Sequence, residues 1–334
     1  MNDQAYRFSG CESLSFFLSI LLIFLTTALI KGNPVADFDG DGKSDISVFR
    51  PSDGFWYVAK SSGGYSSVRW GLSTDTPVAG DYDGDGKTDL AAFRRTPMGN
   101  FITNNVWYIL KSSDNNYRAV TWVPNSPYYL YDAPFSADYD GDGKTDIAVF
   151  RNSDAIGDRA SFKVLQSSTE TGIDMLWGVS GNDQAVPADY DGDGKIDYAV
   201  FRYGTFNTPA NQLNSWFILQ SSNGVLRVER FGLPIDKLVP ADYDGDGKAD
   251  IAVWRPSDGF WYRLNSRDNS FNATRFGLSD DKPTPADYDG DGKTDIAVFR
   301  PSNGVWYLQR STGGFTAQQF GAANDIPIPN TFVR

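Results

Sequence analysis

The sequence predicts an all-β fold, a β-propeller of six four-stranded blades. Three observations lead to this prediction: an aspartate-rich motif occurs six times, the same short apolar segments accompany each copy, and the composition suits strands. Aromatic residues make up 15% of the 334 residues, and there are 33 glycines and 17 prolines. Such a composition is typical of many short strands joined by tight turns.

The N-terminal segment is the one part that does not look like strands. Residues 14–30, LSFFLSILLIFLTTALI, form a 17-residue apolar run that ends at Lys31. Its length lies between that of a secretory signal and that of a membrane span, so residues 1–32 are expected to be a signal peptide or a retained anchor helix. A buried segment is the remaining alternative. Residues 33–334 are then the propeller, secreted or displayed at the cell surface.

The repeated motif is D-x-D-G-D-G-K-x-D. Its six copies begin at Asp37, Asp81, Asp138, Asp189, Asp242 and Asp287, and successive copies are 44 to 57 residues apart. Intervals of this size are typical of propeller blades or solenoid units.

Four apolar segments follow one another in each repeat. In the first cycle they are residues 45–50, 54–58, 65–71 and 77–80, and each is rich in β-branched and aromatic residues. They read as the strands of a meander, and four strands make a blade whose faces must be covered by neighbouring blades. The tail at 320–329 repeats the strand that precedes each motif without a seventh motif. We expect it to close the ring, with a seven-bladed or truncated array as the alternative.

The motif has the residue types that bind calcium. Carboxylates at positions 1, 3, 5 and 9 and the carbonyl of position 7 supply hard oxygens, and glycines at positions 4 and 6 permit the tight turn. Position 12 is valine or alanine, so the loop is not an EF-hand, and magnesium prefers fewer carboxylates. We expect about six Ca²⁺ ions, held by Asp37, Asp39, Asp41, Lys43, Asp45, Asp81, Asp83, Asp85, Lys87, Asp89, Asp138, Asp140, Asp142, Lys144, Asp146, Asp189, Asp191, Asp193, Lys195, Asp197, Asp242, Asp244, Asp246, Lys248, Asp250, Asp287, Asp289, Asp291, Lys293 and Asp295.

Charge agrees with this interpretation. The chain carries −12, the six motifs alone carry −18, and six divalent ions would neutralise the whole. Calcium sites of about 10⁻⁴ to 10⁻³ M affinity are filled outside cells, which fits export. The acidic chain is not expected to bind nucleic acid or an anionic membrane surface, and any membrane contact is expected through an uncleaved N-terminal segment alone.

The composition also bears on catalysis. Histidine is absent and Cys11 is the only cysteine, so no Ser-His-Asp triad, Cys-His dyad, His-ligated zinc site or internal disulfide can form. We therefore expect that the chain is not an enzyme. A polysaccharide lyase or glycosidase is the alternative, and it would need a carboxylate pair outside the motifs.

These residues resemble the FG-GAP repeats, also described as VCBS-type repeats, of integrin α-subunits and secreted bacterial proteins. The aspartate motif is present six times, and the Phe-Gly pair that precedes it appears as Trp70-Gly71, Trp177-Gly178, Phe231-Gly232, Phe276-Gly277 and Phe320-Gly321. The second junction departs from this pattern, with Trp122-Val123, and Phe-Arg-Pro or a similar sequence replaces Gly-Ala-Pro. The resemblance implies a calcium-binding propeller that acts in adhesion or in carbohydrate or protein binding.

Two further recurring residues are expected to be structural. An arginine ends the second strand of every repeat, at Arg50, Arg94, Arg151, Arg202, Arg255 and Arg300. We expect it to stack on the aromatic residue of the Trp56 type in its repeat or to pair with an aspartate, the alternative being a ring of cations that binds an anion. The third-strand aromatics are expected in the core: Trp56, Trp107, Phe162, Trp216, Trp261 and Trp306.

Insertions indicate where a ligand would bind. They fall at 96–105, 124–135, 153–160 and 203–214, and the order of strands predicts that all lie on the face opposite the calcium motifs. The ligand-binding candidates are Phe101, Tyr128, Tyr129, Tyr131, Tyr203 and Phe206, with Asn104, Asn105, Asp132 and Asn207 beside them. Neutral loop extensions are the alternative. We expect a monomeric binding or adhesion module for an extracellular protein or glycan, with a lectin as the alternative.

Overall fold

The computed structural model describes residues 36–98, 102–122, 132–153, 157–204 and 214–329, and these residues contain strands and no helix. They belong to one compact unit, Lys31–Arg334. Within the described ranges, no helix is long and apolar enough to cross a membrane. The expected signal or anchor segment, residues 1–32, lies outside the described residues.

Six separate four-stranded antiparallel sheets form the blades. In order from the inner to the outer strand, the first blade contains β24 (Ile326–Ile328), β1 (Ile46–Arg50), β2 (Phe55–Ala59) and β3 (Tyr65–Arg69). The second contains β4 (Thr76–Pro77), β5 (Leu90–Met98), β6 (Ile102–Leu110) and β7 (Tyr117–Thr121), and the third β8 (Asp132–Pro134), β9 (Ile147–Arg151), β10 (Arg159–Leu165) and β11 (Gly172–Val179). The fourth contains β12 (Asp183–Ala185), β13 (Tyr198–Arg202), β14 (Ser215–Leu219) and β15 (Leu226–Arg230). The fifth contains β16 (Lys237–Leu238), β17 (Ile251–Arg255), β18 (Phe260–Leu264) and β19 (Phe271–Arg275), and the sixth β20 (Lys282–Pro283), β21 (Ile296–Arg300), β22 (Val305–Arg310) and β23 (Gly314–Gln319).

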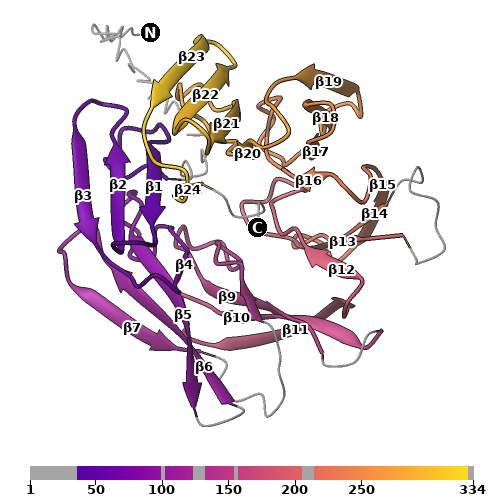
Figure 1. The fold of residues 1–334 in the computed structure, drawn as a ribbon. Helices are drawn as coiled ribbons and strands as arrows, with labels where there is room; N and C mark the ends of the chain where they lie inside the picture. Colours follow the sequence, from indigo (N-terminus) through magenta and orange to yellow (C-terminus); the bar gives the residue numbers. More distant parts are fainter. Residues whose placement is uncertain (1–35, 99–101, 123–131, 154–156, 205–213, 330–334) are drawn as a thin grey trace, which may run out of the picture. The chain divides into compact units, whose positions relative to one another are not determined.

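The ring closes through the first blade. The C-terminal strand β24 pairs antiparallel with β1, with Ser47 opposite Ile328 and Phe49 opposite Ile326. Figure 1 shows this contact as a yellow strand beside an indigo one. The prediction of a six-bladed propeller is confirmed, and the tail closes the ring rather than beginning a seventh blade.

Burial along the strands follows from stacking of the blades. Strands such as β1, β9, β17 and β21 are buried at four consecutive residues, because both faces of the blade are covered. The outermost strands alternate instead, as in β15 and β19, because one face packs inward and the other meets water.

The hydrophobic core lies between the blades. One cluster joins Trp216 and Ile218 of the fourth blade to Leu238 and Val253 of the fifth, and five further clusters are built in the same way among the described residues. The prediction that the third-strand aromatics are core residues is confirmed, because none of the six is more than 1% exposed. Full burial of a tryptophan at this position stabilises the blade by about 3 kcal/mol or more.

One insertion differs from expectation. Residues 96–105 read as a loop, but the structure extends both strands of this hairpin, so that β5 and β6 each have nine residues and Met98 pairs with Ile102. Ile102 and Val106 are β-branched residues at alternating positions, which favours continued pairing. The hairpin therefore projects from the end of its blade opposite the aspartate loop.

Candidate metal centres

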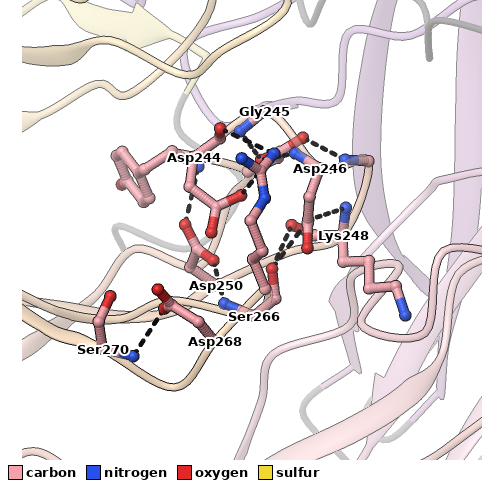
Figure 2. A network of polar contacts seen from close by, with 12 residues as sticks. Asp244, Gly245, Asp246, Lys248, Asp250, Ser266, Asp268 and Ser270 are labelled. Carbon is pink, nitrogen blue, oxygen red and sulfur yellow. Dashed lines mark hydrogen bonds and ion pairs between the residues drawn. The ribbon is translucent and has the colours of Figure 1, made fainter.

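In the second to sixth blades the aspartate loop joins the inner strand to the next strand, and in the first blade, whose inner strand β24 is C-terminal, the loop leads into β1. In the first five loops, three carboxylate oxygens from one loop lie within 4.8 Å of one another. Positions 1, 3 and 5 converge in the first, second and fifth loops, and positions 1, 3 and 9 converge in the third and fourth. Figure 2 shows Asp244, Asp246 and Asp250 of the fifth loop facing the same small volume. The complete ligand set remains a prediction.

The first aspartate shapes the loop. Asp37 accepts hydrogen bonds from the amides of Gly40 at 2.6 Å and Gly42 at 2.9 Å. The other five loops repeat both bonds. Gly40 and Gly42 have φ near +80°, which only glycine adopts without strain. Burial is the main cause that raises the pKa of Asp37, and the neighbouring Asp41 and Asp39 raise it further.

The aspartate at position 9 of the motif is the most buried ligand candidate. Asp45 has no exposed surface, and its two oxygens accept the amides of Phe38 at 2.9 Å and Ser61 at 2.7 Å. Burial raises the pKa of Asp45 to about 6. Each oxygen keeps a second lone pair, so both bonds are compatible with a metal ligand.

A second turn, between the third and fourth strands of each blade, holds the remaining two aspartates. Ser61 donates its amide to position 9, and the next residue, Ser62, donates its hydroxyl to Asp39 at 2.5 Å. The first serine of this turn also donates its hydroxyl to position 5 in the second to sixth blades. Sequence reasoning missed these residues, although a serine sixteen residues after Asp45 recurs at a similar place in every repeat.

Neighbouring loops are bonded to each other around the ring. The amide at position 8 donates to the carbonyl of position 1 in the preceding loop, as from Thr88 to Asp37 at 2.7 Å, and all six junctions have this bond. The lysine at position 7 lies over the glycine at position 4 of the preceding loop. A Cβ added to Gly84 would lie 2.8 Å from Lys144 Cε, and the other five junctions are equally tight.

The residues present fit calcium. Both carboxylate oxygens of Asp244 and one of Asp289 are buried without a hydrogen-bond partner, which is costly unless a cation is near. The side-chain atoms that would bind the metal are all carboxylate oxygens, the hard ligands that Ca²⁺ prefers. When bound, the ion would supply the positive charge that these clustered carboxylates lack, and Asp37, Asp39, Asp41 and Asp45 with the Lys43 carbonyl would hold it in the first loop.

The recurring arginines form a separate structural ring. Each makes two parallel hydrogen bonds to an aspartate at the start of the inner strand of its blade, as Arg94 does to Asp75 at 2.7 Å. The others are Arg50–Asp325, Arg151–Asp132, Arg202–Asp183, Arg255–Asp236 and Arg300–Asp281. Five of the six also lie 4.3 to 4.4 Å above an aromatic ring. The structural interpretation is confirmed with one correction. The aromatic ring under the arginine belongs to the residue that follows the core tryptophan, as Tyr57 follows Trp56, and not to the tryptophan.

The predicted ligand-binding face is described only in part. Phe101, Tyr128, Tyr129, Tyr131, Phe206 and Asn207 lie outside the described residues. Tyr203 is half-buried, packs edge-on against Phe201 with ring centroids 5.2 Å apart, and donates its hydroxyl to Gln184, so it is less exposed than expected, and its role in ligand binding stays a prediction.

The polar neighbours of that face need the same correction. Asn105 and Asp132 are buried and hydrogen-bonded to each other, and Asp132 also holds Arg151. Both are structural because a buried carboxylate needs partners. Asn104 is half-buried.

Comparison with known proteins identifies the repeats. The FG-GAP-like repeat family matches residues 37–92 and 242–298. No curated protein gives a significant match. Similar solved structures include an arginine-to-alanine triple mutant of AofleA from Arthrobotrys oligospora, with 13% identity, a TM-score of 0.52, and coverage of 85% of this chain and 84% of that chain.

Two further structures are similar at lower TM-scores. The periplasmic gluconolactonase PpgL of Pseudomonas aeruginosa has 10% identity, a TM-score of 0.44, and coverage of 86% of this chain and 99% of that one. Apo AztD of Citrobacter koseri has 13% identity, a TM-score of 0.42, and coverage of 85% and 97%. The expectation that the chain is not an enzyme is therefore corrected, since a protein named as an enzyme is among the similar propellers. At such identities the likeness shows the fold alone, and it assigns no reaction to this chain.

Proposed function

Because the chain is a six-bladed propeller with FG-GAP-like repeats, we propose that it is an exported protein whose six loops bind calcium. In this proposal the calcium-loaded ring is a binding or adhesion module for an extracellular protein or glycan. The observation that carries the calcium assignment is the convergence of three carboxylate oxygens within 4.8 Å in each of five loops, supported by buried carboxylate oxygens of Asp244 and Asp289 that have no hydrogen-bond partner. The apolar run at residues 14–30 supports export.

Calcium would stabilise the ring at the point where neighbouring blades are bonded. At a free concentration ten times the dissociation constant, each site contributes roughly 1.4 kcal/mol, and six contribute about 8 kcal/mol. Net domain stability is about 5 to 15 kcal/mol, so the ion would decide whether the blades stay assembled. A monomeric ring held in this way offers a rigid frame for ligand contacts on the face of the insertions.

The test is calcium binding by calorimetry together with thermal melts in calcium and in chelator. We expect about six ions per chain and a melting temperature that falls on chelation. Asp37→Asn, Asp81→Asn and Asp138→Asn should each reduce the number of ions bound. Asp280→Asn is the matched control, because Asp280 is exposed and lies outside the loops. A melting temperature equal in calcium and chelator would overturn the proposal.

Glycan binding is a second candidate, favoured by one observation. A cavity of about 190 Å³ lies between the second and third blades, and its lining includes Lys111, Arg118 and Lys144 together with Asp83 and Glu170. Glu170 is paired with Arg118 at 3.0 Å, so the two lysines, with Gln166 and Ser167, are the groups that suit the carboxylate and hydroxyls of an acidic sugar.

A glycan array with acidic and neutral sugars, probed in calcium, tests this candidate. Lys111→Gln should lose binding of acidic sugars, whereas Lys60→Gln, the matching change in the first blade, should retain it. Binding of neutral sugars alone would contradict the assignment to this cavity. Turnover of any sugar on the same array would identify an enzyme.

A further inference from the structure

The six loops differ in the side chain that contacts the aspartate at position 3 of the motif. In five blades a hydroxyl from the second turn donates to its carboxylate at 2.5 to 2.8 Å: Ser62 to Asp39, Ser113 to Asp83, Ser168 to Asp140, Ser222 to Asp191 and Thr312 to Asp289. In the fifth blade this position of the turn is Arg267. A cation thus replaces a neutral hydrogen-bond donor in one site of six.

Arg267 faces the site. Its guanidinium Nη2 lies 3.4 Å from the Asp244 carbonyl oxygen, to which it donates, and 3.8 Å from Asp244 Oδ1. The Asp244 side chain is 12% exposed, and neither of its oxygens has a hydrogen-bond partner. Asp246, at position 5 of the motif, is half-buried in this loop, whereas the aspartate at position 5 is exposed in each of the other five loops. The fifth loop is therefore partly covered.

The rest of the fifth loop keeps the common geometry. Asp242 accepts the amides of Gly245 and Gly247 at 2.6 and 2.8 Å, and Ser266 donates to Asp246 at 2.9 Å. Asp250 accepts the amides of Tyr243 and Ser266. Figure 2 shows the contacts of Asp246 and Asp250 with Ser266. The difference is confined to Asp244, at position 3 of the motif, and Arg267 in the second turn.

We propose that Arg267 sets the calcium affinity of the fifth loop, so that the propeller holds five tight calcium ions and one weaker ion. This inference rests on the proposed calcium binding. Two physical effects act together. A fixed positive charge beside a ligand carboxylate repels a divalent cation, and the loss of the hydroxyl leaves that carboxylate without the bond that orients it elsewhere.

The expected effect is about tenfold in affinity. Two unit charges 4 Å apart interact by about 1 kcal/mol in water, and a divalent ion doubles the charge while a larger separation reduces the effect. A tenfold change corresponds to about 1.4 kcal/mol. Salt screens exposed charges, and Arg267 is 57% exposed, so the difference should shrink at high ionic strength.

The experiment measures stepwise calcium binding to the full chain by competition with a chromophoric chelator. For the wild type we expect five ions in one concentration range and one ion that binds roughly tenfold more weakly. Arg267→Ser should bring all six into one range. Ser222→Arg makes the same exchange in reverse in the fourth blade and should create a second weak site. Arg267→Gln removes the charge without restoring the short hydroxyl, so it separates the two effects.

The outcomes are distinct. Recovery of the weak site in Arg267→Gln assigns the effect to charge, and recovery in Arg267→Ser alone assigns it to the hydroxyl; both support the proposal. Six equal sites in the wild type, or a weak site unchanged in both variants, would overturn the role of Arg267 while calcium binding stands. Absence of calcium binding in every variant would overturn the proposed function as well.

Discussion

Removal of calcium should reverse the response of the propeller to acid. In the metal-free loops, burial raises the pKa of the aspartate at position 9 from the ordinary value of 3.8 to about 6 in five repeats. These residues are Asp45, Asp89, Asp146, Asp197 and Asp295. A folded-state pKa above the unfolded value means that the folded chain binds the proton more tightly. That stabilisation is fully present below pH 3.8 and is lost as the pH rises through 6. The calcium-free protein should therefore become more stable on acidification from pH 7 to 5.

The size of the effect follows from the shift. A pKa that moves from 3.8 to about 6 changes the unfolding free energy between pH 7 and 5 by about 1.3 kcal/mol per site. With solvent screening this is about 1 kcal/mol, and about 5 kcal/mol for five sites. Histidine, which ordinarily titrates in this range, is absent, and burial also raises the pKa values of Asp250 and of the aspartates at position 1 of the first five loops, which acts in the same direction.

The calcium-loaded protein should behave in the opposite way. A bound cation favours the ionised carboxylates, so protons and calcium compete, and acidification below about pH 6 releases the ion. Its stability should fall between pH 7 and 5 while that of the calcium-free form rises.

Urea unfolding followed by tryptophan fluorescence measures both curves. The calcium-free sample is prepared by dialysis against a chelating resin, because soluble chelators lose affinity in acid. Parallel losses of stability on acidification with and without calcium would show that the buried ninth carboxylates do not control the metal-free state.

Three further predictions concern single side chains. Gly84→Ala and Gly86→Ala should each destabilise the ring by about 1 kcal/mol because both need a positive φ, and the first should lose only slightly more, since its Cβ meets the flexible end of the Lys144 side chain, which can move aside; urea unfolding measures both, and a loss near zero in either would contradict the requirement for glycine. Arg300→Ala should cost about 3 kcal/mol because it leaves the fully buried Asp281 carboxylate unpaired, and a loss below 1 kcal/mol in the same assay would contradict this. Trp306→Ala should cost about 3 to 5 kcal/mol, and a calorimetric melt unchanged from the wild type would be inconsistent with a packed core.

The fold could be predicted from the sequence because every repeat carries the same motif and the same pattern of strand-like segments. Nine residues that recur six times, each followed by strand-like segments, fix the number of blades and the position of the loops. An aspartate partner was expected for each arginine, but its identity was not predicted, although an aspartate stands 19 residues before Arg94 and at the same distance in four other repeats. The antiparallel register brings the two together, since Thr76 pairs with Phe93 and their neighbours Asp75 and Arg94 then meet.

Other features depended on contacts that spacing does not reveal. The serines of the second turn lie far from the loops in sequence, and the role of Arg267 is visible only once its guanidinium is placed near Asp244. Where burial can be checked, the residues proposed for ligand contact are less exposed than expected: Asn105 is buried and Tyr203 is half-buried, because aromatic and amide side chains in an insertion can also fill space beneath it. The absence of a triad motif did not exclude an enzyme, because catalytic groups are defined by their arrangement and not by residue type.

The lysine that covers the preceding loop changes how the motif itself should be interpreted. The glycine at position 4, such as Gly84, needs a positive φ, and it also lies under Lys144 of the following repeat. The lysine of the motif therefore reflects contact between consecutive repeats. Among descendants of such a ring, replacement of the lysine in one repeat should alter the loop one repeat earlier, whereas the glycine of that loop stays required by its backbone conformation.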